Sequence, residues 1–519
     1  GINYMRRSLD PYTIYYPEEK VKDLDLMISG KYAGVGALIR YNFLLKNTVI
    51  DEPYENMPAA EVGLKKGDVI LAIGDSSMVG KDVAYVSNHL RGDAGTTFIL
   101  TIQRPSVNKK MKFKITRRAI QLPAVPYYGV QDGGVGYLNL NSFTTGCAKD
   151  VRRAFLDMKK QGMTSLVFDL RNNGGGSLQE AVNIVNMFVP KGITLVKTVG
   201  KMERANKEYK TTVEPIDTVM PIVVLVNDET ASASEITSGS LQDLDRAVVL
   251  GTRTYGKGLV QVSMDLPYNG NLKLTSSKYY IPSGRCIQAI NYKHANGGYT
   301  EHVPDSLTHV FHTANGREVR DGGGIKPDVE VRPDSLPNIA FYLASSGRDS
   351  TEVMWNWELQ YLKKHPTIVP AKTFVISDAD FEDFKQAVLK SGFKYDRESK
   401  KYLENLVKLA KFEGYYDDAK GEFDALEKKL NHNLAKDLDY NKQTLKKVLT
   451  SDLVSAYYYQ KGSLENSLQF DKQWKKAVEI LKNPAEYKKL LQPVVGQPLV
   501  KLEPASNVAV DKKQKSKAK

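Results

Sequence analysis

Cysteine is scarce in this sequence of 519 residues, which contains Cys147 and Cys286 and no others. Two cysteines cannot build the disulfide framework of a small secreted scaffold, and an unpaired, buried thiol is the usual state of such residues. The sequence leaves open whether Cys147 and Cys286 form one disulfide bond with each other. Long apolar runs are absent as well. No stretch of about 18 apolar residues occurs, so no membrane-spanning helix is predicted.

Acidic residues are outnumbered by basic ones, and the formal net charge is +13. A nucleic-acid-binding protein gathers such charge on one face or stripe, often with aromatic residues. Here the charge is spread over the whole chain, and residues 511–519 alone hold five lysines and one aspartate. We therefore predict a solvated basic tail and no nucleic-acid partner.

Histidine is also rare, with seven residues in the chain. His294, His302, His309 and His312 fall in one loop-like region, where His309 and His312 could ligate a metal. No cysteine or carboxylate at a suitable spacing completes such a site, so we predict no metal and no other cofactor. The chain also lacks G-x-S-x-G, the turn that presents the nucleophile of α/β-hydrolases.

The chain does contain a clear order of segments that differ in composition. Residues 1–32 indicate an N-terminal helical segment with a turn at Leu9-Asp10-Pro11 and a short polar stretch after it. Residues 33–105 are rich in expected strands and punctuated by glycine. Residues 106–345 alternate strands with helices, which predicts an α/β core with a largely parallel sheet. Its expected strands are Val135–Leu140, Ser165–Asp169, Pro221–Val226 and Arg246–Leu250, and its helices include Lys149–Gln161 and Leu178–Phe188.

From about residue 350 the composition changes to Lys, Glu, Leu and Tyr at helical spacing. Phe381, Phe384 and Val388, for example, repeat at i, i+3 and i+7. We predict an all-helical domain over residues 350–490. The final stretch, residues 491–519, combines Pro, Gly, Gln and Lys and is predicted to be a basic, disordered tail. The chain is thus expected to be multidomain.

The most informative segment is PIVVLVNDETASASE at residues 221–235. An apolar strand ends in a polar turn, and a run of small residues that includes Ser232 then opens a helix. A hydroxyl at this point faces a cleft, and the unpaired N–H groups of a helix N-terminus can stabilise an oxyanion. An ordinary helix cap accounts for the same pattern, because Glu235 follows Ser232 by three residues as in a capping box.

A serine nucleophile needs a base, and Lys257 is the candidate. It lies in Tyr255-Gly256-Lys257-Gly258, after the next expected strand. Burial would lower the pKa of its amine from ~10.4 towards ~7–8, because desolvation disfavours the charged form, and a neutral amine can accept the serine proton. Gln261 is expected to point to the same side and to orient the amine, if extended pairing continues through Leu259.

Lys257 also completes Gly251-x-x-x-x-Gly256-Lys257, which is how a phosphate-binding P-loop begins. Position 258 is glycine, where that loop requires Ser or Thr for magnesium, and no clear Walker-B strand accompanies it. We therefore predict no nucleoside triphosphate site at this position.

A glycine-rich turn follows the expected strand at residues 165–169 and reads DLRNNGGG over residues 169–176. Glycines let the backbone approach a ligand closely and present their N–H groups to it. This turn is therefore the candidate for a second oxyanion donor. A purely structural turn between a strand and a helix accounts for it equally well.

Together these segments resemble the C-terminal processing peptidases, the tail-specific serine proteases of the S41 type. In that family the nucleophile is the middle serine of Ser-Ala-Ser-Ala-Ser-Glu, and the base follows it 25 residues later, which is the spacing of Ser232 and Lys257. Thr230 stands here in place of the first serine. The matching motifs occur in the family's order across roughly residues 5–335: SLDP at 8–11, DLRNNGG at 169–175, ASASE at 231–235, GKG at 256–258 with Gln261, YIPSGR at 280–285 and IKPD at 325–328.

This resemblance implies a ClpP/crotonase-like α/β protease core that uses a Ser232–Lys257 dyad. It implies that Gln261 supports Lys257. The oxyanion donors would be the Ala233 N–H and a glycine N–H within residues 174–176, with Gly175 and Gly176 as the candidates. The helical region after residue 350 lies outside the resemblance.

Residues 33–105 resemble a PDZ domain of the bacterial protease type. In such a domain successive amides of a glycine-rich loop bind a terminal carboxylate, and the strand that follows pairs with the peptide. Arg91 is a regulatory candidate that would contact the protease core and couple peptide binding to alignment of the dyad, although it could simply serve the helix dipole. The implied peptide-binding residues are Gly34, Val35, Gly36 and Ala37 in the loop and Val83, Val86 and Leu90 on a helix.

The sequence therefore predicts a serine endopeptidase that cleaves polypeptides and receives their accessible C-terminal tails in the PDZ-like module. A non-catalytic PDZ scaffold is the alternative. An acyl-CoA enzyme of the crotonase type is a further one, and it would need a nucleotide site but not Ser232. A homodimer or an adaptor protein is left open as a partner. The family implies an extracytoplasmic setting, the bacterial periplasm, and because the sequence starts Gly1-Ile2, we expect any signal peptide or anchor to lie upstream.

Overall fold

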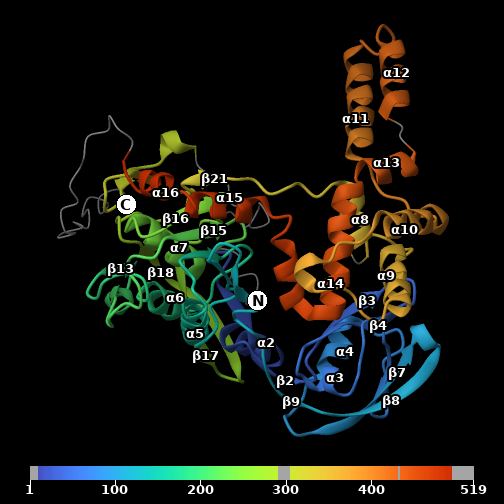
Figure 1. Cartoon of the computed structure of the whole chain (residues 1–519), viewed down its shortest axis with the longest axis horizontal. Helices are drawn as coiled ribbons and strands as arrows, with labels where there is room; N and C mark the ends of the chain where they lie inside the picture. The colour runs from blue at the N-terminus through green and yellow to red at the C-terminus, as the bar shows by residue number, and fades with distance from the viewer. Residues whose placement is uncertain (1–9, 290–303, 346, 431–432, 494–519) are drawn as a thin grey trace, which may run out of the picture. The chain divides into compact units, whose positions relative to one another are not determined.

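The computed structural model describes residues 10–289, 304–345, 347–430 and 433–493 (Figure 1). The chain forms two compact units, each built from segments that are separate in the sequence. The first unit combines residues 10–31, 121–333 and the segment from Asp471 onward. The second unit combines residues 32–120 and 334–470.

A six-stranded sheet lies at the centre of the first unit, in the order β10-β11-β12-β15-β16-β21. β11 to β21 run parallel, and β10 joins one edge antiparallel. All residues of β11, β12 and β15 are buried, as expected for apolar strands of a parallel sheet that is covered on both faces. The predicted α/β core is therefore confirmed. The strands are β10 (Tyr128–Gln131), β11 (Val135–Asn139), β12 (Ser165–Asp169), β15 (Ile222–Val226), β16 (Val248–Gly251) and β21 (Val329–Glu330).

Helices cover both faces of this sheet. Leu138, Phe168 and Val224 belong to one large apolar core together with residues of α5 (Cys147–Lys160), α6 (Leu178–Val185) and α7 (Ala233–Asp243). Because side chains alternate along a strand, Tyr137 points to the other face. Its ring there meets Trp474 of α15 (Lys472–Leu481) edge to face, with 5.5 Å between the centroids.

A second, antiparallel sheet completes the first unit and brings the N-terminal segment to it. β1 (Ile14–Tyr16) pairs with β18 (Gly270–Tyr280), which also pairs with β13 (Thr194–Gly200) and β17 (Leu259–Leu266). β14 (Lys207–Lys210) lies at the far edge. The sequence indicated only a short polar stretch after the turn at residues 9–11. The structure instead has β1 and then α2 (Glu18–Ser29), which buries Leu24.

The second unit begins with the PDZ-like module. Its sheet has the order β3-β4-β5-β7-β8, with β6 (Ser76–Ser77) added to β5 and with the helices α3 (Pro58–Glu61) and α4 (Val83–Leu90). The expected boundary at residue 105 falls inside this sheet, because β8 pairs with β7 along its whole length. The strands are β3 (Ala37–Asn42), β4 (Asn47–Pro53), β5 (Val69–Ile73), β7 (Thr97–Arg104) and β8 (Lys109–Thr116).

The rest of the second unit is helical, as predicted from its composition. Phe381, Phe384 and Val388 lie in one buried apolar cluster, which confirms the face read from their spacing. The helices are α8 (Asn338–Ala344), α9 (Val353–Lys364), α10 (Asp378–Ser391), α11 (Glu398–Glu413), α12 (Lys420–Leu430), α13 (Leu434–Tyr440) and α14 (Lys442–Ser467). Over the part of the chain that the structure describes, no helix is both long and apolar enough to cross a membrane.

The last two helices do not belong to this helical cluster, although the sequence placed them in one domain with it. α15 and α16 (Pro484–Leu490) are part of the first unit. The reason is that α15 has an apolar face of its own. Its residues Trp474, Ala477 and Ile480 are buried and have the spacing of one face of a helix. The Tyr487 hydroxyl also donates to the C=O of Ile222 in β15 (3.1 Å). The predicted tail after residue 493 lies outside the described residues.

Candidate active site

Ser232 stands between β15 and α7 in an unusual backbone conformation. Its φ is 58° and its ψ is −116°, outside the regions that L-residues commonly occupy. Such a conformation costs about 1–3 kcal/mol and persists only where the surroundings enforce it. Strained positions of this kind gather at functional sites, which makes Ser232 a candidate functional residue.

The buried carboxylate of Glu235 enforces this geometry. One of its oxygens accepts the backbone N–H groups of Ser232 and Lys257, each at 2.8 Å. The other accepts the Gly256 N–H (2.7 Å) and the Thr254 hydroxyl (2.6 Å). Burial raises the pKa of Glu235, and these four hydrogen bonds oppose that rise. The sequence suggested only a capping role, whereas the structure shows one carboxylate that joins the Ser232 turn to the Lys257 loop.

Lys257 has the electrostatic surroundings expected of a general base. Burial lowers the pKa of its amine to about 8, helped by the positive charge of Lys273 and opposed by Glu235 and Asp10. Its Nζ lies 4.6 Å from the centroid of the Tyr12 ring, which comes from the N-terminal segment.

A tyrosine from the second sheet connects the two candidate residues. The Tyr279 hydroxyl donates to the Lys257 C=O (2.7 Å) and lies 3.2 Å from the C=O of Ser232. No sequence motif singled out Tyr279, because its pairing with both segments follows from the position of β18.

Gln261 does not bond to the amine as expected. Its Nε2 donates to the Thr275 hydroxyl (3.3 Å), which in turn donates to the Asp10 carboxylate (2.9 Å). The expectation assumed regular alternation along β17. The register between β17 and β18 instead shifts between Val260 and Gln261, so that Gln261 stands opposite Thr275.

The glycine-rich turn presses directly against the Ser232 turn. Gly175 has φ +96°, and a Cβ placed on it would lie 2.6 Å from the Ala231 C=O oxygen and 2.8 Å from the Ala233 nitrogen. Only glycine fits there. The Gly175 N–H, however, donates to Asn173 Oδ1 (2.9 Å), so this structure does not present it as an oxyanion donor.

Two other N–H groups remain as oxyanion candidates. The Gly175 C=O accepts the N–H of Phe143 (3.0 Å). Since the C=O and N–H of a trans peptide point in opposite directions, the Gly176 N–H points away from Phe143. The Ala233 N–H opens α7, where the first amides of a helix have no partner within the helix.

The two candidate residues Ser232 and Lys257, the glycines of residues 174–176 and Gln261 line one cavity of about 590 Å³ in the first unit. Ser232, Lys257 and Gln261, which the sequence singled out separately, are thus brought together. α2 closes part of the cavity with apolar side chains that the sequence did not predict. The lining residues are Leu24, Met27, Ile28, Ser142, Gly174, Gly175, Gly176, Ser177, Leu178, Ser232, Ala233, Ile236, Lys257, Leu259, Val260, Gln261, Ser263, Lys273 and Tyr279.

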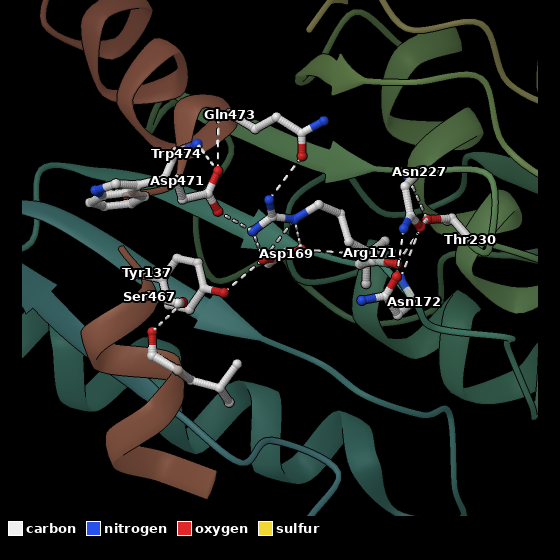
Figure 2. A network of polar contacts seen from close by, with 12 residues as sticks. Tyr137, Asp169, Arg171, Asn172, Asn227, Thr230, Ser467, Asp471, Gln473 and Trp474 are labelled. Atoms are coloured by element: carbon white, nitrogen blue, oxygen red, sulfur yellow. Dashed lines mark hydrogen bonds and ion pairs between the residues drawn. The ribbon is translucent and has the colours of Figure 1, made fainter. Parts of the chain in front are cut away.

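Figure 2 shows how the glycine-rich turn is fixed at its beginning. The Arg171 guanidinium pairs with Asp169 (2.9 Å from Nε) and with Asp471 (2.7 Å), and it donates to Gln473 Oε1 (2.8 Å). The Tyr137 hydroxyl donates to Asp169 as well (2.7 Å). Asp471 also caps α15 by accepting the N–H of Gln473 (2.8 Å). A C-terminal helix therefore holds the turn that follows β12, a link that no local motif reveals.

The same turn is tied to the Ser232 turn through side chains (Figure 2). Asn227 Oδ1 accepts the Asn172 N–H (2.9 Å), and the Thr230 hydroxyl donates to the Leu170 C=O (2.9 Å). Thr230 thus provides a hydroxyl at the position where the resembling family has serine.

The structure of the PDZ-like module corrects part of the predicted peptide-binding set. Val86 is fully buried, and Val35 and Leu90 are nearly so, because they form the core of the module rather than the wall of an open groove. Gly34 and Gly36 are buried, and Ala37 and Val83 are half-buried. β3 is the end strand of its sheet. The Arg91 guanidinium lies 5.5 Å from the centroid of the Tyr32 ring in its own unit, and its regulatory role stays a prediction.

Histidine and cysteine are the residue types that could have indicated a metal site or a disulfide bond. His309 is exposed and lies 3.0 Å from an Asp321 oxygen. His294 and His302 lie outside the described residues. No cluster of three or more His, Cys, Asp or Glu side chains in the described ranges could hold a metal ion. Cys147 and Cys286 are both free thiols.

Comparisons with known proteins match three parts of the chain to family models. Residues 134–294 match the model of peptidase family S41, and residues 49–104 match that of the PDZ domain. Residues 342–481 match a model described as "Probable PDZ-protease, C-terminal helical domain", which covers the helical region that the sequence resemblance did not.

Individual relatives agree with these matches. A carboxy-terminal-processing protease of Bartonella bacilliformis is 37% identical over 295 residues, which are 56% of this chain and 67% of that protein. A "Probable CtpA-like serine protease" of Staphylococcus aureus is 31% identical over 408 residues, 77% of this chain and 68% of that protein. Among solved structures, the photosystem II D1 C-terminal processing protease is 27% identical with a TM-score of 0.34, covering 63% of this chain and 80% of that one.

The contact between Gly175 and the Ser232 turn gives a first prediction. We expect Gly175→Ala to slow labelling of Ser232 by a serine-reactive phosphonate by about 100-fold, because the added Cβ displaces the turn by roughly an ångström. Gly174→Ala is the matched control, since its Cβ would meet nothing within 4 Å. The rate is measured by mass spectrometry of the intact protein. Equal labelling of the two variants would contradict the proposed tight contact.

Proposed function

Because the chain belongs to peptidase family S41 and is a serine-type peptidase, we propose that it cleaves polypeptides with Ser232 as the nucleophile and Lys257 as the general base. The observation that carries this proposal is the shared cavity. It brings a strained serine at a helix N-terminus together with a buried lysine whose pKa is about 8. A lysine of ordinary pKa would be almost fully protonated at neutral pH and could not accept a proton.

The proposed reaction has two halves. Ser232 Oγ attacks the scissile carbonyl carbon while the neutral Lys257 amine takes the hydroxyl proton. The tetrahedral intermediate collapses, the C–N bond breaks, and Lys257 returns the proton to the leaving amine. This gives an ester between Ser232 and the acyl part of the substrate. Lys257 then takes a proton from water, whose oxygen attacks the ester carbonyl. The ester C–O bond breaks, Lys257 returns the proton to Ser232 Oγ, and the new C-terminus is released.

The oxyanion that forms in each half needs two donors. We assign them to the Ala233 N–H at the start of α7 and the Gly176 N–H, because the Gly175 N–H is occupied by Asn173. Preorganised donors of this kind typically contribute about 10²–10³ in rate each. Gln261 would then be a positioning residue that acts through Thr275 and Asp10 rather than by contact with the amine.

The PDZ module suggests how substrates are selected. A substrate's C-terminal tail would add as a strand beside β3, with its carboxylate bound by the loop of residues 34–37. By likeness to the carboxy-terminal-processing and CtpA-like relatives, the natural setting would be extracytoplasmic. A non-catalytic PDZ scaffold is the alternative, but it gives no reason for a lysine of lowered pKa beside Ser232.

Removal of the nucleophile tests the proposal. Ser232→Ala should lower the rate of casein hydrolysis on the order of 10⁴-fold or more. Its affinity for a labelled peptide with a free C-terminus, measured by fluorescence anisotropy, should stay unchanged. Ser263→Ala is the control, because Ser263 lines the same cavity and bonds to Asn271 instead (2.6 Å). It should keep its activity. Undiminished hydrolysis by Ser232→Ala would refute the assignment.

The pH dependence tests the base. Lys257 must be neutral to act, so kcat/KM should rise with pH up to about 8, where its pKa lies, and then level off. Lys273 lowers that pKa by its positive charge, so Lys273→Met should raise it and move the rising limb to higher pH.

Lys278→Met is the matched control for the pH experiment, because Lys278 is an exposed residue of the same strand. The Lys278→Met variant should leave the rising part of the kcat/KM profile at the wild-type pH. A limb that stays fixed in Lys273→Met, or moves to lower pH, would show that another group titrates.

A further inference from the structure

α11 and α12 form a helical hairpin within the second unit. Figure 1 shows the two helices side by side, leading away from α10 and α13. α11 has 16 residues, or about 24 Å of helix, and ends at Gly414, whose φ is +84°. We use the name hairpin for residues 394–430, which comprise both helices and the residues next to α11.

The hairpin buries very little of its own apolar surface. α12 has no buried residue among those described, and in α11 Leu403 is the buried apolar side chain. Two helices of this length are marginal in water unless tertiary packing covers an apolar face. The hairpin therefore has apolar surface that its own two helices do not cover.

That surface forms a stripe along α11. Tyr402 is 73% exposed, Leu406 49%, Leu409 50% and Phe412 89%. Their spacing of four, three and three residues keeps Tyr402, Leu406 and Leu409 on one face, with Phe412 at its margin. Scattered apolar residues on a surface need no explanation, but a contiguous stripe marks an interaction site.

The charges of the hairpin show what kind of partner fits. Its base, residues 394–408 and 427–430, has a formal net charge of +3. Its tip, residues 411–424, has a formal net charge of −3. A partner with one sign of charge, such as an anionic membrane surface or an acidic protein, would attract one end and repel the other. A second hairpin laid antiparallel matches both ends at once.

We propose that the hairpin is a dimerisation element, which pairs antiparallel with the hairpin of a second copy of this chain to form a four-helix bundle. The stripe on α11 of one copy covers the stripe of the other. The acidic tip of each copy lies at the basic base of its partner. A two-fold axis through the middle of the hairpin relates the copies, as in most homodimers.

The size of the stripe agrees with this arrangement. Two aromatic side chains as exposed as Tyr402 and Phe412 offer on the order of 300 Å² in each copy. With Leu406, Leu409 and the charged flanks, counted in both copies, the surface approaches the ~1,200 Å² of a small specific interface.

Sedimentation of the whole chain tests the proposal first. The wild type should sediment with twice the 58.0 kDa mass of one chain, and Leu406→Asp with Leu409→Asp should halve that mass. Val219→Asp is the control, because Val219 is an apolar residue of the first unit that is 84% exposed. Casein hydrolysis and circular dichroism show that each variant is folded. A monomeric wild type, or a Leu406→Asp/Leu409→Asp variant that keeps its mass, would overturn the proposal.

Charge reversal tests the antiparallel orientation. One variant reverses the tip (Glu413→Lys, Asp417→Lys, Asp418→Lys) and another reverses the base (Lys400→Glu, Lys428→Glu, Lys429→Glu). Each alone should be monomeric, because like charges then face each other at both ends. An equimolar mixture should recover the dimer, since both ends are again complementary. Failure of the mixture to associate, or dimers of either variant alone, would refute the antiparallel pairing.

Discussion

The Glu235 carboxylate is the interaction on which the proposed chemistry depends. It accepts hydrogen bonds from Ser232, Thr254, Gly256 and Lys257 while fully buried. Hydrogen bonds to an ionised acceptor are stronger than neutral ones, and removal from water strengthens them further. They offset the strained backbone of Ser232 and fix the loop of Lys257 relative to it. One side chain therefore positions the proposed nucleophile and the proposed base through their backbone N–H groups.

A second set of contacts positions the glycine-rich turn of residues 169–176. β12 and β15 are parallel neighbours, so the turns that follow them meet at the same edge of the sheet, where ligands of α/β proteins bind. Gly175 allows these turns to touch, and Asn172, Asn227 and Thr230 tie them together. Arg171 extends this frame to Asp471 in the C-terminal segment. The site thus depends on residues about 300 positions away from the turn they hold.

Sequence patterns predicted the features that depend on residues close together in the chain. The apolar strands, the helix spacing of Phe381, Phe384 and Val388, and the order of the motifs around Ser232 and Lys257 are properties of short segments. The errors share one physical origin, which is pairing between distant segments. A register shift placed Gln261 opposite Thr275, and packing buried Val86 in the core of the PDZ domain. The sequence made no prediction about Tyr12, whose approach to Lys257 also joins distant segments. Glu235 was recognised as a capping residue because its bonds to Gly256 and Lys257 leave no local signature.

The most direct test of this account is the reactivity of Ser232 in Glu235→Gln. An amide keeps the shape of the side chain but points an NH₂ group at backbone N–H donors, so the frame around Ser232 and Lys257 should loosen. We expect labelling by a serine-reactive phosphonate, followed by intact-protein mass spectrometry, to fall by about 100-fold in protein that circular dichroism shows to be folded. Labelling of folded Glu235→Gln at the wild-type rate would contradict the claim that this carboxylate holds the site together.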